Sequence, residues 1–169
     1  MSRMKIIIVA WLSLFVLTAC TQSTEDVLNE ADKHLKDVFL SNEQIDTNYS
    51  FKQFDIYKPD ELEVVETSDH NIIFSNGNQP FVLLINEFES PNSKWFYNQI
   101  SEEDSLHLRT YESDDAFAYL HAVEREDENE GYEIHVGIGG VKMSTITEVR
   151  QMSEDVEMMI QMIKSVEEN

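Results

Sequence analysis

The chain contains a single cysteine, Cys20, and this limits how a fold of this length can be stabilised. One thiol can form neither an intramolecular disulfide nor a cysteine-rich metal site. From Cys20 to the C-terminus the 169-residue chain has 150 residues, enough for one packed domain and too few for two. We therefore expect one domain that is held together by its hydrophobic core.

The first twenty residues have the pattern of an export signal. Arg3 and Lys5 precede an apolar stretch from Ile6 to Val16, and Leu17-Thr18-Ala19-Cys20 follows. As a helix, the stretch from Ile6 to Leu17 would span only about 18 Å, well short of the roughly 30 Å of a hydrocarbon core. The segment resembles the signal of bacterial lipoproteins, whose lipobox ends in the cysteine that receives the lipid.

This resemblance implies that Cys20 is the lipidation site and the first residue of the mature chain. The chain would then divide into a signal peptide (1–19), a lipidated tether (20–23) and a single α+β domain (24–169). Two acyl chains would hold the domain at the cell membrane, on its extracytoplasmic face. The alternative is a cleaved secretory signal in which the cysteine is incidental.

The net charge is strongly negative. Loss of Arg3 and Lys5 lowers the basic count from 12 to 10 against 33 acidic residues, so the mature chain has a formal charge of −23. Such a charge excludes nucleic acid as a partner and repels anionic lipid headgroups. The acidic surface either faces cations or a basic partner, or is uniformly solvated.

Two segments have helical periodicity. In the first, roughly 24–40, a capping-box start at Ser23 precedes apolar residues at helical spacing. The second, about 147–166, carries one apolar stripe: Val149, Met152, Val156, Met159, Ile160, Ile163 and Val166. A short helix that starts at Pro91 and carries Trp95, Phe96 and Ile100 would cross the sheet in mid-chain.

Extended segments occupy most of the remaining chain. Candidate strands are 50–57, 62–67, 71–75, 81–87, 106–111, 116–124, 132–138 and 141–145. Asn76-Gly77-Asn78 predicts a hairpin, and Gly137-Ile138-Gly139-Gly140 predicts a bulge or bend. The apolar run from Phe81 to Ile85 does not alternate, which predicts a central strand covered on both faces.

The fold class predicted is α+β. A mainly antiparallel sheet of about six to seven strands is flanked by an N-terminal helix, a short crossing helix and a long C-terminal helix. Residues 50–166 resemble the Mog1/PsbP-like group in three features: Phe54-Asp55-Ile56-Tyr57 running into Pro59, the crossing helix, and a last helix closing on Ile163-Lys164-Ser165-Val166. The tryptophan that often follows the proline in that group is absent. The resemblance implies a fold and no functional residue.

The search for chemical motifs yields no catalytic residue, metal site or cofactor. The five histidines have no metal-ligand spacing, and His107 and His135 are expected at solvated or cross-strand polar positions. The acidic turn 124–131 lacks the spacing of a calcium loop, and Gly137 to Lys142 matches no nucleotide-binding motif. The aromatic cluster Trp95-Phe96-Tyr97 is interpreted as core, with sugar or peptide binding as the alternative.

Two methionines of the last helix lie outside its apolar stripe. Met158 points away from the stripe and Met162 lies beyond its edge, so both are candidates for a partner surface, with burial against the first helix as the alternative. The sequence thus favours a membrane-anchored, non-enzymatic binding or accessory module of the cell envelope, with a protein or envelope component as its partner. The alternatives are an envelope hydrolase that uses paired carboxylates and a cation-binding lipoprotein.

Overall fold

The computed structural model describes residues 23–100, 105–125 and 131–169. The lipidation site predicted at Cys20 therefore lies outside the described residues. Two long helices and two sheets make up the described chain, in this order: α2 (Thr24–Leu40), β1 (Tyr49–Phe51), β2 (Phe54–Ile56), β3 (Glu63–Thr67), β4 (Asn71–Asn76), β5 (Gln79–Ile85), η2 (Tyr97–Gln99), β6 (His107–Glu112), β7 (Phe117–Glu124), β8 (Tyr132–Ile138), β9 (Val141–Thr147), α3 (Val149–Lys164) and β10 (Glu167–Glu168).

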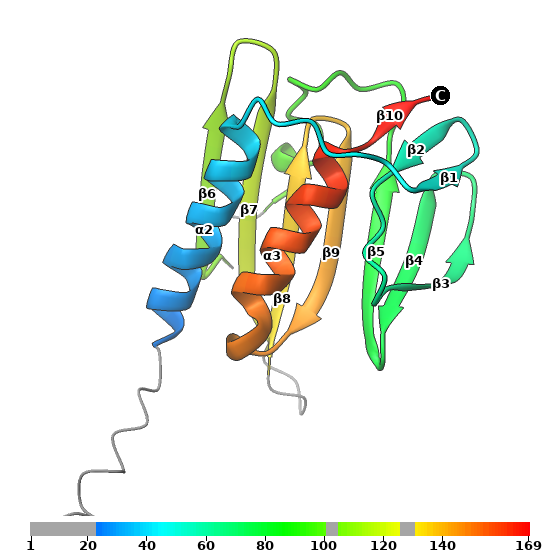
Figure 1. The fold of residues 1–169 in the computed structure, drawn as a ribbon. Coiled ribbons are helices and arrows are strands. Elements are labelled where there is room, and N and C mark those ends of the chain that lie inside the picture. The colour runs from blue at the N-terminus through cyan, green and yellow to red at the C-terminus, as the bar shows by residue number, and fades with distance from the viewer. Residues whose placement is uncertain (1–22, 101–104, 126–130) are drawn as a thin grey trace, which may run out of the picture.

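The main sheet confirms the predicted α+β class. Its seven strands are in the order β3-β4-β5-β9-β8-β7-β6, and every pair of neighbours is antiparallel. Both α2 and α3 lie on the same face, side by side (Figure 1). We call this the inner face and the opposite one the outer face.

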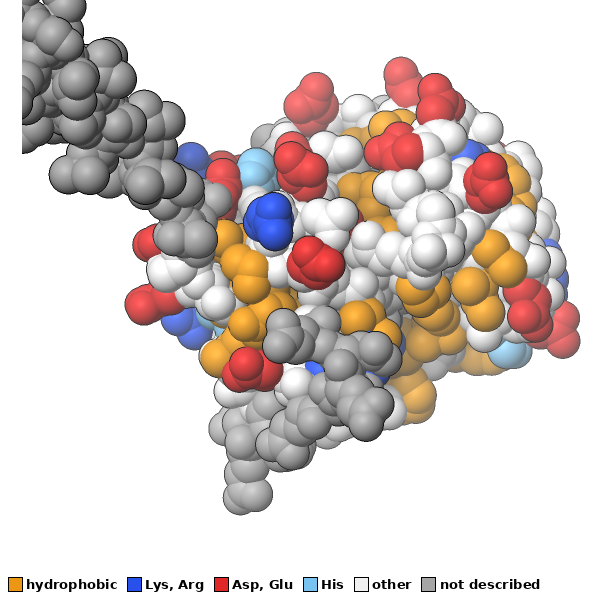
Figure 2. Space-filling model, turned by 90° about the horizontal axis from the view of Figure 1, so that it is seen from below, with side chains coloured by type: hydrophobic (Ala, Val, Ile, Leu, Met, Phe, Trp, Pro, Cys, Tyr) orange, Lys and Arg blue, Asp and Glu red, His pale blue; other side chains and the backbone are white. Residues whose placement is uncertain are grey.

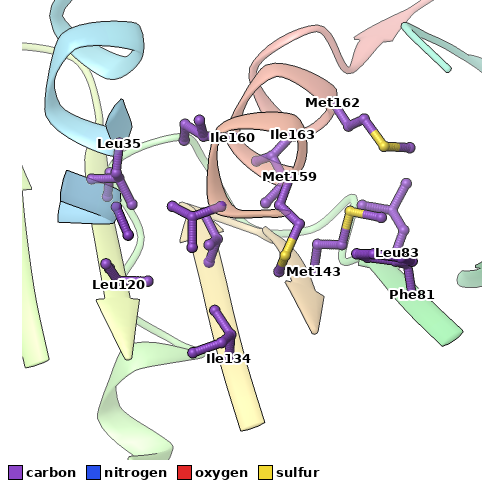
Figure 3. Close-up of a cluster of buried hydrophobic side chains, with 14 of the residues drawn as sticks. Leu35, Phe81, Leu83, Leu120, Ile134, Met143, Met159, Ile160, Met162 and Ile163 are labelled. Atoms are coloured by element: carbon purple, nitrogen blue, oxygen red, sulfur yellow. The ribbon is translucent and has the colours of Figure 1, made fainter. Parts of the chain in front are cut away.

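The core lies between the inner face and the two helices. Figure 3 shows Leu35 of α2 above Leu120 of β7, and Ile160 on the side of α3 that faces α2; these residues and Ile134 of β8 are fully buried. Met143 and Leu83 extend the same layer over β9 and β5. The amphipathic stripe predicted for the last helix is the surface that it buries here.

The Ser23 cap sets the start of α2 as predicted, and a residue distant in sequence binds its other end. The Ser23 hydroxyl accepts a hydrogen bond from the Asp26 amide at 3.2 Å, so it satisfies one of the free amides of the first turn. At the other end, the Lys164 ammonium donates to the carbonyls of Val38 and Ser41, at 2.6 Å each. These bonds tie the last turn of α2 to the last turn of α3.

Two hairpins follow from glycines. Gly77 has φ of 59° in the turn between β4 and β5, a left-handed conformation that glycine adopts without strain, as the Asn-Gly-Asn signal predicted. Gly139, with φ of 53°, and Gly140 form the turn between β8 and β9. The glycine-rich segment is therefore a hairpin turn, and not the bulge or bend within a strand that we expected.

The prediction that Phe81 to Ile85 is covered on both faces is wrong. In β5 burial alternates, with Phe81, Leu83 and Ile85 buried on the inner face and Val82 and Leu84 half-buried on the outer face. The strand buried on both faces is β7, where six consecutive residues from Phe117 are buried. The reason is that the described part of the connection after β5 covers the outer face of β7, where Tyr97 packs against Phe117 and Tyr119.

That connection is also less helical than predicted. The segment from Pro91 contains turns and one 3₁₀ turn at Tyr97–Gln99 in place of a short α-helix. It still crosses the sheet, since β5 lies in the interior of the strand order and β6 at the far edge. The crossing places the Tyr97 ring against Phe117 and Tyr119, with centroids 5.2 and 6.0 Å apart.

The predicted strand 50–57 is a small hairpin. Lys52, with φ of 54°, turns the chain between β1 and β2, and β10 pairs with β2 to complete a three-stranded sheet. The last helix ends at Lys164, and its predicted extension to Val166 is replaced by the lead into β10. Phe54 and Ile56 join the main core from this small sheet.

Candidate binding site on the outer face of the sheet

A pair of histidines lies at the centre of the outer face. His121 of β7 and His135 of β8 are directly opposite in the register, and their rings stack with centroids 5.4 Å apart and 17° between planes. His121 is only 6% exposed, and the side chain of His135 is 17% exposed. Of the two positions expected for His135, solvated or cross-strand polar, the structure has the cross-strand one, and Phe96, Gln99 and Ile100 of the connection after β5 border the pair.

Short polar contacts fix the two rings. His135 shares a hydrogen bond of 3.0 Å between its Nδ1 and the Ser144 hydroxyl, and its Nε2 lies 3.3 Å from Glu133 Oε1. On the other ring, His121 Nε2 shares a hydrogen bond of 2.9 Å with the Ser105 hydroxyl. His121 Nδ1 is buried and has no hydrogen-bond partner among the described residues.

Burial sets the charge of this pair. It lowers the pKa of His135 to about 4, with the nearby charges of Lys142 and His121 adding to the effect. Burial also lowers the pKa of His121, again with Lys142 as the second cause. Because the pKa of His135 lies far below 7, that ring is neutral at neutral pH.

Tyr119 lies beside the histidines and owes its position to a glycine. A Cβ built on Gly137, the residue opposite it in β8, would lie 2.3 Å from Tyr119 Cε1, so the aromatic ring occupies the space above this glycine. The Tyr119 hydroxyl is buried without a hydrogen-bond partner among the described residues, and burial raises its pKa. A buried hydroxyl in this state costs free energy that a ligand or water can recover.

Lys142 supplies the positive charge of the site. It lies opposite Gly137 in β9, and its ammonium lies 5.4 Å from the centroid of the Phe96 ring. Burial lowers the pKa of Lys142, whereas the charge of Glu133 acts in the opposite direction. Within the described residues this ammonium forms no hydrogen bond or ion pair, so its charge is only partly compensated.

These groups surround a hollow of about 250 Å³. At about 30 Å³ per molecule, it has room for roughly eight waters. Strands β7, β8 and β9 form its floor, and the crossing connection forms its rim. The residues that line it are Phe96, Gln99, Ile100, Tyr119, His121, Val123, His135 and Lys142. We call this the histidine pocket.

A second buried polar cluster joins α2 to β6. The Tyr111 hydroxyl donates a hydrogen bond of 2.7 Å to Asp32 Oδ2, and burial together with this bond raises the pKa of Tyr111 to about 12. His107 Nε2 lies 4.0 Å from Asp32 Oδ1, and neither atom has a hydrogen-bond partner among the described residues. This cluster fixes α2 on the sheet and borders no pocket of the site.

The buried carboxylate of α3 has a structural role. Asp155 accepts hydrogen bonds from the Thr147 hydroxyl at 2.5 Å and from the Gln79 amide at 2.7 Å. Burial raises its pKa, and the two bonds oppose that effect. Of the carboxylates that the structure describes, it alone is buried, whereas the hydrolase hypothesis requires two that lie close together. The same residues contain no group of three or more potential metal ligands.

The two candidate methionines of α3 differ in burial. Met162 is fully buried, and Figure 3 shows its side chain directed away from α2. It cannot belong to a partner surface, because the side of α3 that faces away from α2 is buried as well. Met158 is half-buried and packs against the core. Trp95, interpreted as core, is 47% exposed, whereas Phe96 and Tyr97 do pack on the outer face.

No protein-family model matches this chain, and no similar sequence is found among curated proteins. Within the described residues, no helix is long and apolar enough to cross a bilayer. The site is therefore interpreted from its own residues. Sequence patterns did not reveal the histidine pocket, because its residues come from three strands and one connection. Those described above are Phe96, Tyr119, His121, His135 and Lys142.

Proposed function

We propose that this protein is a lipid-anchored binding module on the extracytoplasmic face of the cell membrane, attached through Cys20, and that the histidine pocket binds a negatively charged group of its ligand. The anchor follows from the lipobox Leu17-Thr18-Ala19-Cys20. An envelope component or protein that carries a carboxylate or phosphate is the ligand class that fits.

The observation that carries the proposal is the charge of Lys142, which is only partly compensated. A half-buried ammonium is stabilised by a counter-charge, and the described residues supply none within ion-pair distance. The neutral ring of His135 can donate or accept a hydrogen bond without adding charge. An anionic group in the pocket would pair with the ammonium and bring hydrogen-bond partners to the buried polar atoms.

The lining of the pocket favours binding over catalysis. The described residues that line it include no serine, cysteine or carboxylate that could serve as a nucleophile. Ser105 and Ser144 contact the histidines but lie outside the lining. The site thus offers one cation, two imidazoles and apolar walls, which is the composition of a recognition site.

Anion binding is tested by melting the purified lipidated protein in acetate or phosphate, with chloride of equal ionic strength as the reference. A ligand that binds the native state raises the melting temperature. We expect a rise that Lys142→Met removes and that Lys33→Met, on the exposed face of α2, leaves intact. An equal rise in both variants would show that the anion binds elsewhere.

The anchor is tested separately. Cys20→Ala removes the one thiol of the chain, so incorporation of labelled fatty acid and partition into detergent should both be lost. A variant that still incorporates fatty acid would disprove attachment through Cys20. Ser23→Ala, three residues further along, is the matched control and should be processed like the parent protein.

A further inference from the structure

The end of the domain at which α2 begins combines features of a membrane-contact surface. Figure 1 shows that α2, α3, β6 and β8 all start at this end, next to the point where the tether joins the domain. The Thr24 hydroxyl lies 3.4 Å from the Tyr132 hydroxyl, so the first residue of α2 contacts the first residue of β8. We call this region the tether end.

Two arginines line a hollow at the tether end. The hollow has a volume of about 490 Å³. Of the three arginines that follow Cys20 in the sequence, Arg125 and Arg150 line it, and the third is Arg109. Glu124 and Glu148 lie beside them. The described part of this hollow is therefore locally neutral, in a mature chain whose formal charge is −23.

Apolar side chains border the same end on the outer face. Leu106 is 45% exposed and Ile146 is 39% exposed. The register places Ile146 opposite Glu133 and Glu133 opposite Val123, so these side chains form one row across the sheet. Figure 2, which views this end directly, shows hydrophobic side chains gathered over part of it, with acidic side chains mostly nearer the rim.

The length of the tether determines which surface faces the bilayer. Only Thr21, Gln22 and Ser23 separate Cys20 from the first residue of α2. At most about 3.6 Å per residue, four steps of chain reach roughly 14 Å. The lipidated cysteine lies at the headgroups, so the start of α2 cannot move further away than that. The opposite end of α2, after its 17 residues, lies about 24 Å further along the helix.

We infer that the tether end contacts the bilayer that holds the anchor, with Arg150 on lipid phosphates and Leu106 and Ile146 against the headgroup boundary. This inference rests on the lipid anchor of the proposed function. Arginine suits the contact because its planar guanidinium binds phosphate oxygens in pairs. The histidine pair lies two residues along the strands from the row of Ile146, about 7 Å further from the membrane.

The single cysteine makes the orientation measurable. In the lipidated protein Cys20 carries the lipid, so one introduced cysteine is the only thiol that reacts with a maleimide fluorophore. Ile146→Cys places the label at the tether end, and Leu40→Cys, at a residue 49% exposed, places it at the far end of α2. Both proteins are reconstituted in phosphatidylcholine vesicles with nitroxide-labelled headgroups, because zwitterionic lipid does not repel the acidic domain.

We expect the nitroxides to quench the label at position 146 and to leave the label at position 40 unquenched. Equal quenching at the two positions would overturn the inference while leaving the anchor in place. Protection of position 146 in native membranes, together with no quenching in protein-free vesicles, would also overturn it, because a protein partner would then cover this end. Reaction of the parent protein with maleimide at Cys20 would instead contradict the proposed function.

The contribution of Arg150 is tested in the Ile146→Cys protein. Arg150→Gln should reduce the quenching at position 146, because the guanidinium contact with phosphate is lost. Arg109→Gln, the control on β6, should leave the quenching unchanged. Quenching that persists in Arg150→Gln would show that the apolar side chains and the tether alone set the orientation, and the arginine contact would be withdrawn.

Discussion

The two faces of the main sheet differ in the side chains that they bury, although the same strands form both. On the inner face most side chains of the central strands are apolar and buried, and α2 and α3 pack against β7, β8 and β9. The outer face carries the stacked histidines, the partly compensated Lys142 and half-buried apolar residues, beneath a connection with one 3₁₀ turn. The stability of the fold thus depends mainly on the inner face. On the outer face, burial of polar groups costs free energy of folding.

The largest difference is expected between two adjacent leucines of β5. Leu83 points to the inner face and is fully buried, whereas Leu84 points to the outer face and is half-buried. Leu83→Ala should reduce the free energy of unfolding by about 2 to 5 kcal/mol, and Leu84→Ala by about half as much or less. Urea denaturation of both variants measures this. Equal losses would mean that the outer face over β5 is packed as tightly as the core.

The second effect is a pH dependence that comes from the outer face. The pKa of His135 is about 4 in the folded protein and about 6.5 in the unfolded chain. Between these values the unfolded state binds more protons, so stability falls as the pH drops from 6.5 toward 4 and then levels off. A shift of this size corresponds to at most about 3 kcal/mol.

His135→Gln should flatten this part of the stability profile, since glutamine does not titrate. The variant His34→Gln is the control, because His34 lies at the surface between α2 and α3 and has a solvent-accessible side chain. Melts in urea at a series of pH values give the profile. A slope that survives in His135→Gln would assign the dependence to His107 or His121, whose pKa values burial also lowers.

Local patterns of the sequence predicted those parts of the fold that depend on neighbours along the chain. The first helix, the apolar stripe of the last helix and the Asn76-Gly77-Asn78 hairpin follow from spacing, capping and turn chemistry. The split of residues 50–57 at Lys52 was missed because a non-glycine residue in a left-handed conformation has no sequence signature. The pairing of β10 with β2 was missed because two acidic residues have no strand propensity.

The site depends on residues that are distant in sequence, and this is why it was missed. His121 and His135 were seen as separate strand residues, and only the register between β7 and β8 stacks them. Their burial depends on the path of residues 86–100 after β5, which no periodicity encodes. Gly137 was expected to mark a bulge or bend, whereas it makes room for the ring of Tyr119. The burial of Met162 likewise required knowledge of what lies on the second side of α3.

The third prediction concerns Gly137, which makes room for the Tyr119 ring. Gly137→Ala places a methyl group 2.3 Å from Tyr119 Cε1, so the ring must move, and we expect a loss of about 1 to 3 kcal/mol. In a Tyr119→Leu background the same change should cost less. The difference between the two costs is a double-mutant coupling energy. Equal costs in both backgrounds would mean that strand geometry, and not the ring, requires glycine here.

The smallest effect is expected at Met158, which is half-buried on α3, in contrast to the fully buried Met162 of the next turn. Met162→Ala removes a core side chain and should cost about 2 to 5 kcal/mol, whereas Met158→Ala should cost about 1 kcal/mol or less. Because both substitutions replace the same residue on the same helix, helix propensity changes equally and the difference reports packing alone. Comparable costs would show that the side of α3 bearing Met158 belongs to the core, and that α2 and α3 pack together as closely as they do against the sheet.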